Sequence, residues 1–157
     1  MRNIELPPKV RYSARSKEKV FKIDRGCRIG RTYTDYKKFL SKEPGIQHVE
    51  MDSVIGSVGE KVLLTVHFVS CSFMIALIRD ANTSRSVIDY FDDLYNLLGR
   101  EDCKKLFRVI LTDNGSEFSN PKEIEFGPGQ NDARRTWIFI AMQGNYIRRE
   151  RLRSIMN

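Results

Sequence analysis

Two aspartates, Asp52 and Asp113, have the type and setting that metal-dependent chemistry requires. Asp113 follows the apolar run FRVILT and precedes Asn114 and Gly115, so its carboxylate is expected where a buried strand ends. Asp52 lies in the alternating segment 49–55, where a lone carboxylate is costly to bury without a partner. If these segments pair as neighbouring strands, the two carboxylates repel each other, and a divalent cation relieves that repulsion. The pattern therefore predicts a metal site for phosphodiester chemistry, the alternative being an ordinary turn after the strand.

The segments around these aspartates predict one α+β domain with a mixed five-stranded sheet. The first three strands are expected as an antiparallel meander, with a glycine-containing turn after the first. Alternation and β-branched residues place the five strands at 49–55, 61–69, 73–78, 107–112 and 136–140.

Two helices are expected to flank this sheet. Residues 83–98 carry apolar side chains at helical spacing, and Thr83 or Ser84 can cap the start of this helix. A shorter helix is predicted at 34–40, with Thr34 as its N-cap.

Three segments, VEMDSVIG, KVLLTVHFV and VILTDNGSEFSNP, resemble the catalytic core of DDE transposases and retroviral integrases, which share the ribonuclease H-like fold. The resemblance is most specific to the insertion-sequence-thirty family of bacterial transposases. In that family an EMD motif opens the core, and a TDNGSEF motif carries the second aspartate. The segment CRIGRTYTDYKKFL is also similar to the family's linker between its DNA-binding and catalytic regions, so the resemblance covers about residues 6–140.

That resemblance implies that Asp52 and Asp113 are catalytic residues that bind a pair of Mg²⁺ or Mn²⁺ ions. Asn114 and Gly115 would shape the loop where the backbone approaches DNA. The implied partners are the insertion-sequence ends and the target DNA, with homo-oligomers in intact members and a bacterial cytoplasmic location. The remaining acid of the motif, Glu117, is interpreted first as a loop carboxylate and second as a further ligand.

The family's third metal ligand, a glutamate on a helix after the fifth strand, has no clear counterpart. The segment AMQGNYIRRERLRSIMN at 141–157 offers only Glu150, which four arginines surround. Permitted codons for this segment also encode, in a second frame, CDAGQLYQKGAIEKHHE, which is similar to the family's KGxIExxHE segment with the third acid. We therefore expect a frameshifted tail and a catalytically defective fragment; codons incompatible with that frame would exclude the frameshift.

Positive charge is concentrated toward both ends of the chain. Residues 1–48 hold 13 Lys and Arg against 5 Asp and Glu, and residues 133–157 hold 6 against 1. The centre, residues 49–132, is acidic, with 8 against 14. Basic segments of this kind neutralise nucleic-acid phosphates, although a solvated basic tail is the alternative.

These patterns divide the chain into a basic linker with a short helix at 1–45, an incomplete integrase-like core at 46–140 and the basic tail. In the linker, Arg25, Arg28 and Arg31 are expected to contact DNA. Two other functions remain open. One is a non-catalytic DNA-binding or regulatory fragment, and the other is a ribonuclease H-like nuclease of another family, which needs a replacement acid.

Neither the cysteines nor the apolar segments predict a zinc site, a disulfide or a membrane span. Cys27, Cys71 and Cys103 are widely spaced, so we expect three reduced thiols, with Cys71 and Cys103 partly buried. No apolar run approaches the roughly 20 residues of a membrane helix. The N-terminal residues lack the apolar region of a secretory signal, which favours a cytoplasmic location.

Overall fold

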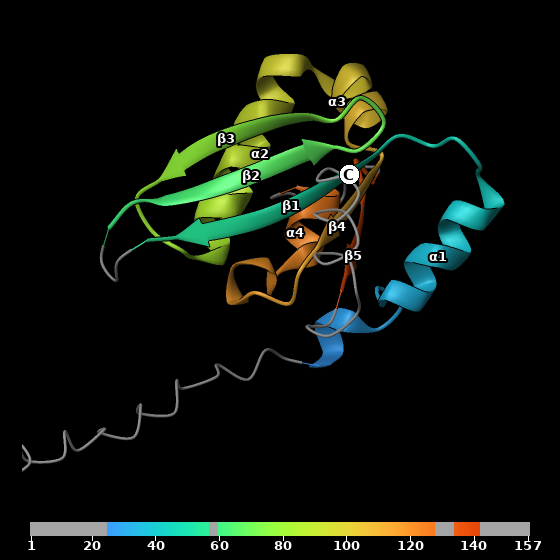
Figure 1. The fold of residues 1–157 in the computed structure, drawn as a ribbon, viewed down its shortest axis with the longest axis horizontal. Helices are drawn as coiled ribbons and strands as arrows, with labels where there is room; N and C mark the ends of the chain where they lie inside the picture. Colours follow the sequence, from blue (N-terminus) through green and yellow to red (C-terminus); the bar gives the residue numbers. More distant parts are fainter. Residues whose placement is uncertain (1–24, 57–59, 128–133, 142–157) are drawn as a thin grey trace, which may run out of the picture.

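The computed structural model describes residues 25–56, 60–127 and 134–141 (Figure 1). Within these residues the chain forms a mixed five-stranded sheet with helices on both faces, which confirms the predicted α+β class. The strand order is β3-β2-β1-β4-β5. The strands are β1 (His48–Ile55), β2 (Val62–Phe68), β3 (Phe73–Arg79), β4 (Val109–Thr112) and β5 (Trp137–Ile140).

The first three strands form the predicted antiparallel meander, with β2 between β1 and β3. The other edge of β1 pairs with β4 in parallel, and β4 pairs with β5 in parallel. Because strand side chains alternate, Val49 and Met51 enter the core while Glu50 and Asp52 lie on the opposite face. The sheet therefore has two faces with different coverings.

One face of the sheet packs against α2 (Ser84–Leu98), α3 (Arg100–Leu106) and α4 (Pro121–Phe126), which lie behind it in Figure 1. The predicted cap holds, since the Thr83 hydroxyl accepts a hydrogen bond from the Ser86 amide. The buried face of α2 carries Val87, Ile88 and Phe91, in accordance with its helical periodicity. This layer forms the larger core.

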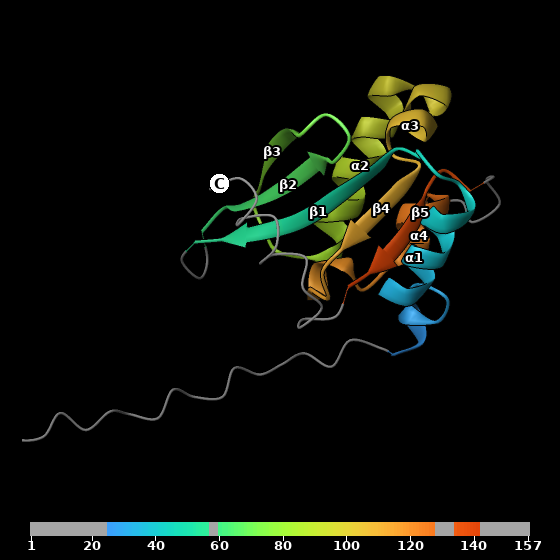
Figure 2. The ribbon, with the colours of Figure 1, turned by 45° about the vertical axis from the view of Figure 1, so that its right-hand side comes forward.

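The other face carries α1 (Tyr33–Lys42), which lies in front of β5 in Figure 2. Tyr36 packs there against Val109, Leu111 and Phe139. The predicted cap at Thr34 is wrong by two residues, because Thr32 forms a reciprocal capping box with Asp35. The hydrogen bond from the Thr32 side chain lowers the pKa of Asp35. The helix predicted for the linker therefore belongs to the same packed domain as the sheet.

The segment before α1 also lies against the sheet. The short helix η1 (Arg25–Arg28) is followed by an extended turn in which Thr32 makes a parallel bridge to Ile140. The Ile140 amide donates to the Arg31 carbonyl over 2.7 Å. The described part of the linker thus continues the sheet beyond β5.

Three features differ from the expectations or add to them. Helices α3 and α4 were not predicted, and Cys71 is exposed rather than partly buried. Cys103 is buried as expected, and burial raises the pKa of its thiol.

Among the described residues, no helix has the length and apolar character needed to cross a membrane. The tail predicted at 141–157 lies outside the described residues apart from Ala141.

Candidate functional site

The parallel pairing of β1 with β4 brings Asp52 beside Asp113. The register matches Met51 with Thr112, and each aspartate is the next residue along its segment. Neighbouring strands lie about 4.8 Å apart, so the two carboxylates leave adjacent backbone positions. Asp52 lies on the sheet face opposite Met51, and Asp113 is the first residue after β4. The pairing of these segments, on which the predicted metal site depends, is therefore present; their metal-binding role stays a prediction.

Asp52 is half-buried and is oriented by its own strand. Its Oδ1 accepts a hydrogen bond from the Ser53 amide at 2.8 Å. Its carbonyl accepts a hydrogen bond from the Thr65 hydroxyl, on the neighbouring β2, at 3.0 Å. These contacts fix the backbone that carries the carboxylate.

Asp113 is exposed at the start of a tight loop. Its Oδ1 accepts a hydrogen bond from the Gly115 amide at 3.0 Å, which is the turn that Asp favours. Between them, Asn114 holds a buried Oδ1 that has no hydrogen-bond partner among the described residues. Hard cations such as Mg²⁺ bind carboxamide oxygens of this kind.

The backbone conformation of Gly115 does not require glycine, since its φ of −66° suits any residue. A Cβ at this position would collide with the end of the Glu117 side chain, whose carboxylate would have to shift. Glu117 itself is only 5% exposed, on the short helix η2 (Ser116–Phe118). The acid predicted first as a loop carboxylate is therefore buried under the loop that carries Asp113.

The sequence analysis missed Arg79, a buried residue that contacts Ser53, the neighbour of Asp52 in β1. It ends β3, is 1% exposed, and donates to the Ser53 hydroxyl at 2.7 Å. It also donates to the Ser86 hydroxyl at 2.8 Å and to Asn82 Oδ1 at 3.0 Å. Burial lowers the pKa of Arg79, while the negative charge of Glu117 raises it. One guanidinium thus joins β1, β3 and α2 next to Asp52.

A signal for Arg79 was present in the sequence. In the segment FMIALIR, Arg79 shares its strand parity with Ile75 and Leu77, both of which face the core. A charged residue at a core position is expensive to bury and indicates a polar partner inside the protein. That argument identifies the position, although it does not identify the partners.

The described residues contain two of the acids that the predicted site needs. Across 25–56, 60–127 and 134–141, no group of three or more His, Cys, Asp or Glu side chains is arranged to hold a metal ion. Glu150, the acid considered for a third ligand, lies outside these residues. The metal-ligand candidates in this part of the chain are therefore the Asp52 and Asp113 carboxylates, with the Asn114 amide oxygen next to Asp113.

The arginines expected to contact DNA lie in and just after η1, and the carbonyl of Arg31 accepts a hydrogen bond from Ile140, which pairs with Thr112. Arg25 begins η1, but its side chain lies outside the described part. Arg28 is half-buried, and its Nε has no hydrogen-bond partner among the described residues. Arg31 donates to Glu125 through Nε at 3.3 Å and through Nη2 at 2.6 Å. DNA contact by these three residues stays a prediction.

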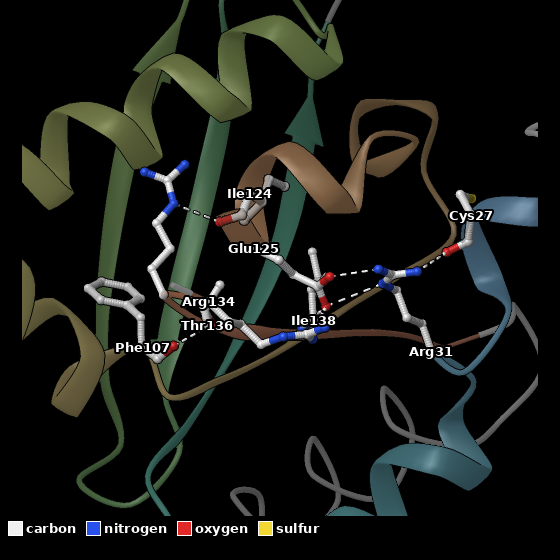
Figure 3. Close-up of polar contacts among 9 residues, drawn as sticks. Cys27, Arg31, Phe107, Ile124, Glu125, Arg134, Thr136 and Ile138 are labelled. Carbon is white, nitrogen blue, oxygen red and sulfur yellow. Dashed lines mark hydrogen bonds and ion pairs between the residues drawn. The ribbon is translucent and has the colours of Figure 1, made fainter. Parts of the chain in front are cut away.

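The Arg31 contact is part of a buried ion network around α4, shown in Figure 3. Glu125 is 1% exposed and also pairs with Arg134 at 3.0 Å. Arg31 additionally donates to the Cys27 carbonyl at 3.2 Å. One carboxylate therefore holds the linker and the segment before β5 against α4.

No known protein-family model matches the sequence, and no curated protein matches it either. The function is therefore argued from the residues and their geometry.

Proposed function

We propose that the chain is the core portion of a DDE transposase of the insertion-sequence-thirty type, which cuts and joins DNA strands with divalent metal ions. The observation that carries this proposal is the pairing of β1 with β4, which sets Asp52 beside Asp113. The mixed sheet supports the ribonuclease H-like part of the proposal, because it is compatible with such a core. The motifs around both aspartates support the family.

The residues at this edge fit a Mg²⁺ or Mn²⁺ site. Both aspartates supply carboxylate oxygens, and the buried Asn114 Oδ1 has no hydrogen-bond partner among the described residues. When bound, a pair of such ions activates the attacking oxygen and stabilises the leaving oxygen of a phosphodiester. Asp52 is half-buried and fixed by β1, whereas Asp113 is exposed where a DNA phosphate can approach.

The chain itself is proposed to be defective in strand transfer. Two carboxylates hold a metal pair less well than three, because each carboxylate offsets part of the positive charge of the ions and supplies oxygen ligands to them. The basic linker and the segment near β5 still allow the chain to bind DNA through phosphates. The purified chain with Mg²⁺ or Mn²⁺ should therefore bind a duplex without cutting or joining it.

A non-catalytic DNA-binding or regulatory fragment is the second candidate. It is favoured by the separation of charge along the chain, with 13 Lys and Arg against 5 Asp and Glu in residues 1–48. In that case the aspartates are only scaffold residues, and DNA binding depends on salt but not on a divalent metal.

Duplex binding with and without Mn²⁺ separates the two candidates. Anisotropy of a labelled duplex, at constant ionic strength, should show binding that Mn²⁺ tightens several-fold, because Asp52 and Asp113 would hold a cation whose charge attracts phosphate. The Asp52→Asn variant should lose this gain, and the matched control Asp89→Asn, on the exposed side of α2, should keep it. Equal binding with and without Mn²⁺ would favour the second candidate, and efficient strand transfer would contradict the proposed defect.

A further inference from the structure

A cavity of about 260 Å³ opens at the start of β4 and β5, whereas Asp113 lies where β4 ends. Four of the residues that line it are cationic and none is acidic. They are Lys104, Arg108, Arg134, Arg135, Thr136 and Trp137. Pockets for drug-sized ligands are about 300–1,000 Å³, so this one suits a smaller group. The lining indicates a ligand with negative charge.

Arg134 is pre-organised at this cavity. Its guanidinium carbon lies 3.8 Å from the centre of the Trp137 ring and 4.7 Å from that of Phe126. Its Nη1 donates to Glu125 at 3.0 Å, which occupies one of the five donors of the group. The Arg134 side chain remains 30% exposed. A planar fork held by rings and an ion pair is suited to bind oxyanions at low entropic cost.

The wall and the rim of the cavity have different roles. Arg135 forms the wall, since its side chain is 5% exposed and pairs with Asp92 at 2.5 Å. At the rim, Arg108 pairs with Glu43 at 3.3 Å, and both side chains are about half exposed, so this pair exchanges easily. Lys104, on α3, is half-buried beside them. The rim cations can therefore turn toward a ligand.

The charge around Arg134 is incompletely balanced. Its partner Glu125 also pairs with Arg31, so one carboxylate faces two guanidiniums. A partly buried excess of positive charge is relieved by an anion, and a phosphate supplies several acceptor oxygens.

We propose that this cavity binds a phosphate group, with Arg134 as its fixed donor and Lys104 and Arg108 closing over it. The same chemistry is offered by a small phosphate and by a nucleic-acid phosphodiester. The proposal uses neither Asp52 nor Asp113, so it stands or falls independently of the proposed strand-transfer function.

Trp137 provides the test, because it is the only tryptophan of the chain. Inorganic pyrophosphate, titrated into the full chain at constant ionic strength, should change the tryptophan fluorescence in a saturable way. The Lys104→Gln and Arg134→Lys variants should each weaken binding about tenfold, as expected for losing one charge-assisted hydrogen bond. The control Lys61→Gln, on the exposed turn before β2, should bind like the unchanged chain.

Two competition arms identify the source of the phosphate. Displacement of pyrophosphate by a short DNA duplex points to a phosphodiester, and its retention points to a small phosphate; either result supports the site. The absence of a saturable fluorescence change with either ligand would overturn the proposal. A response that Lys104→Gln and Arg134→Lys both leave unchanged would also overturn it.

Discussion

Replacement of Arg79 by leucine is expected to lower the free energy of unfolding by about 3–5 kcal/mol, because three acceptors lose their charged donor, at about 1–3 kcal/mol for each buried group left unsatisfied. Arg79 is 1% exposed and donates to Ser53, Ser86 and Asn82. Its removal leaves these acceptors without their donor and leaves the buried charge of Glu117 uncompensated. Chemical denaturation followed by circular dichroism measures the loss.

The double variant Arg79→Leu/Glu117→Leu is the informative control for this prediction. The negative charge of Glu117 acts on Arg79 without a direct ion pair, and removing two buried charges that attract each other is often less costly than removing one. The double variant should therefore be more stable than Arg79→Leu alone. If the double variant instead loses as much stability as the two single variants together, the charges of Glu117 and Arg79 do not stabilise each other.

Replacement of Glu125 by glutamine should have the second-largest effect, about 2–4 kcal/mol, somewhat below the range for a fully buried pair. The change keeps the shape of the side chain and removes the charge that Arg31 and Arg134 share. Since these arginines are 13% and 30% exposed, solvent recovers part of the loss. The segment around η1 should also loosen, because Arg31 is its polar link to α4.

Two measurements check the Glu125→Gln prediction. Urea denaturation gives the change in stability, and limited trypsin digestion should show faster cleavage after Arg28 and Arg31. Lys105→Ala is the matched control, because its pair with Asp102 is exposed and should contribute no more than about 0.5 kcal/mol. A Glu125→Gln protein as stable and as resistant as this control would show that the network does not hold the linker.

The sheet could be predicted from the sequence because its signal is local. Alternation along 49–55 and the β-branched run at 61–69 identify β1 and β2, and helical periodicity identifies α2. The pairing of β1 with β4 was only a condition of the predicted metal site, because local patterns do not determine which strands become neighbours. The spacing of apolar residues was therefore enough to predict most of the strands and the longest helix.

The missed features depend on contacts between distant residues. Helices α3 and α4 have seven and six residues, too few for a clear periodic pattern. The guanidinium of Arg31 pairs with a carboxylate 94 residues away, and no local rule identifies that partner. Charged residues are usually at the surface, so the burial of Arg79 and Glu125 required tertiary structure to be seen.

The central claim is that Asp52 and Asp113 together hold a divalent metal ion, and Mn²⁺ titration of the full chain tests it most directly. Electron paramagnetic resonance of free Mn²⁺ gives the affinity, and broadening of the Ser53 and Gly115 amide signals gives the location. We predict weak binding at this edge that Asp52→Asn and Asp113→Asn each reduce by at least about tenfold, with Asp89→Asn unchanged. Equal affinity in all three variants, or no broadening of the Ser53 and Gly115 signals, would contradict the claim.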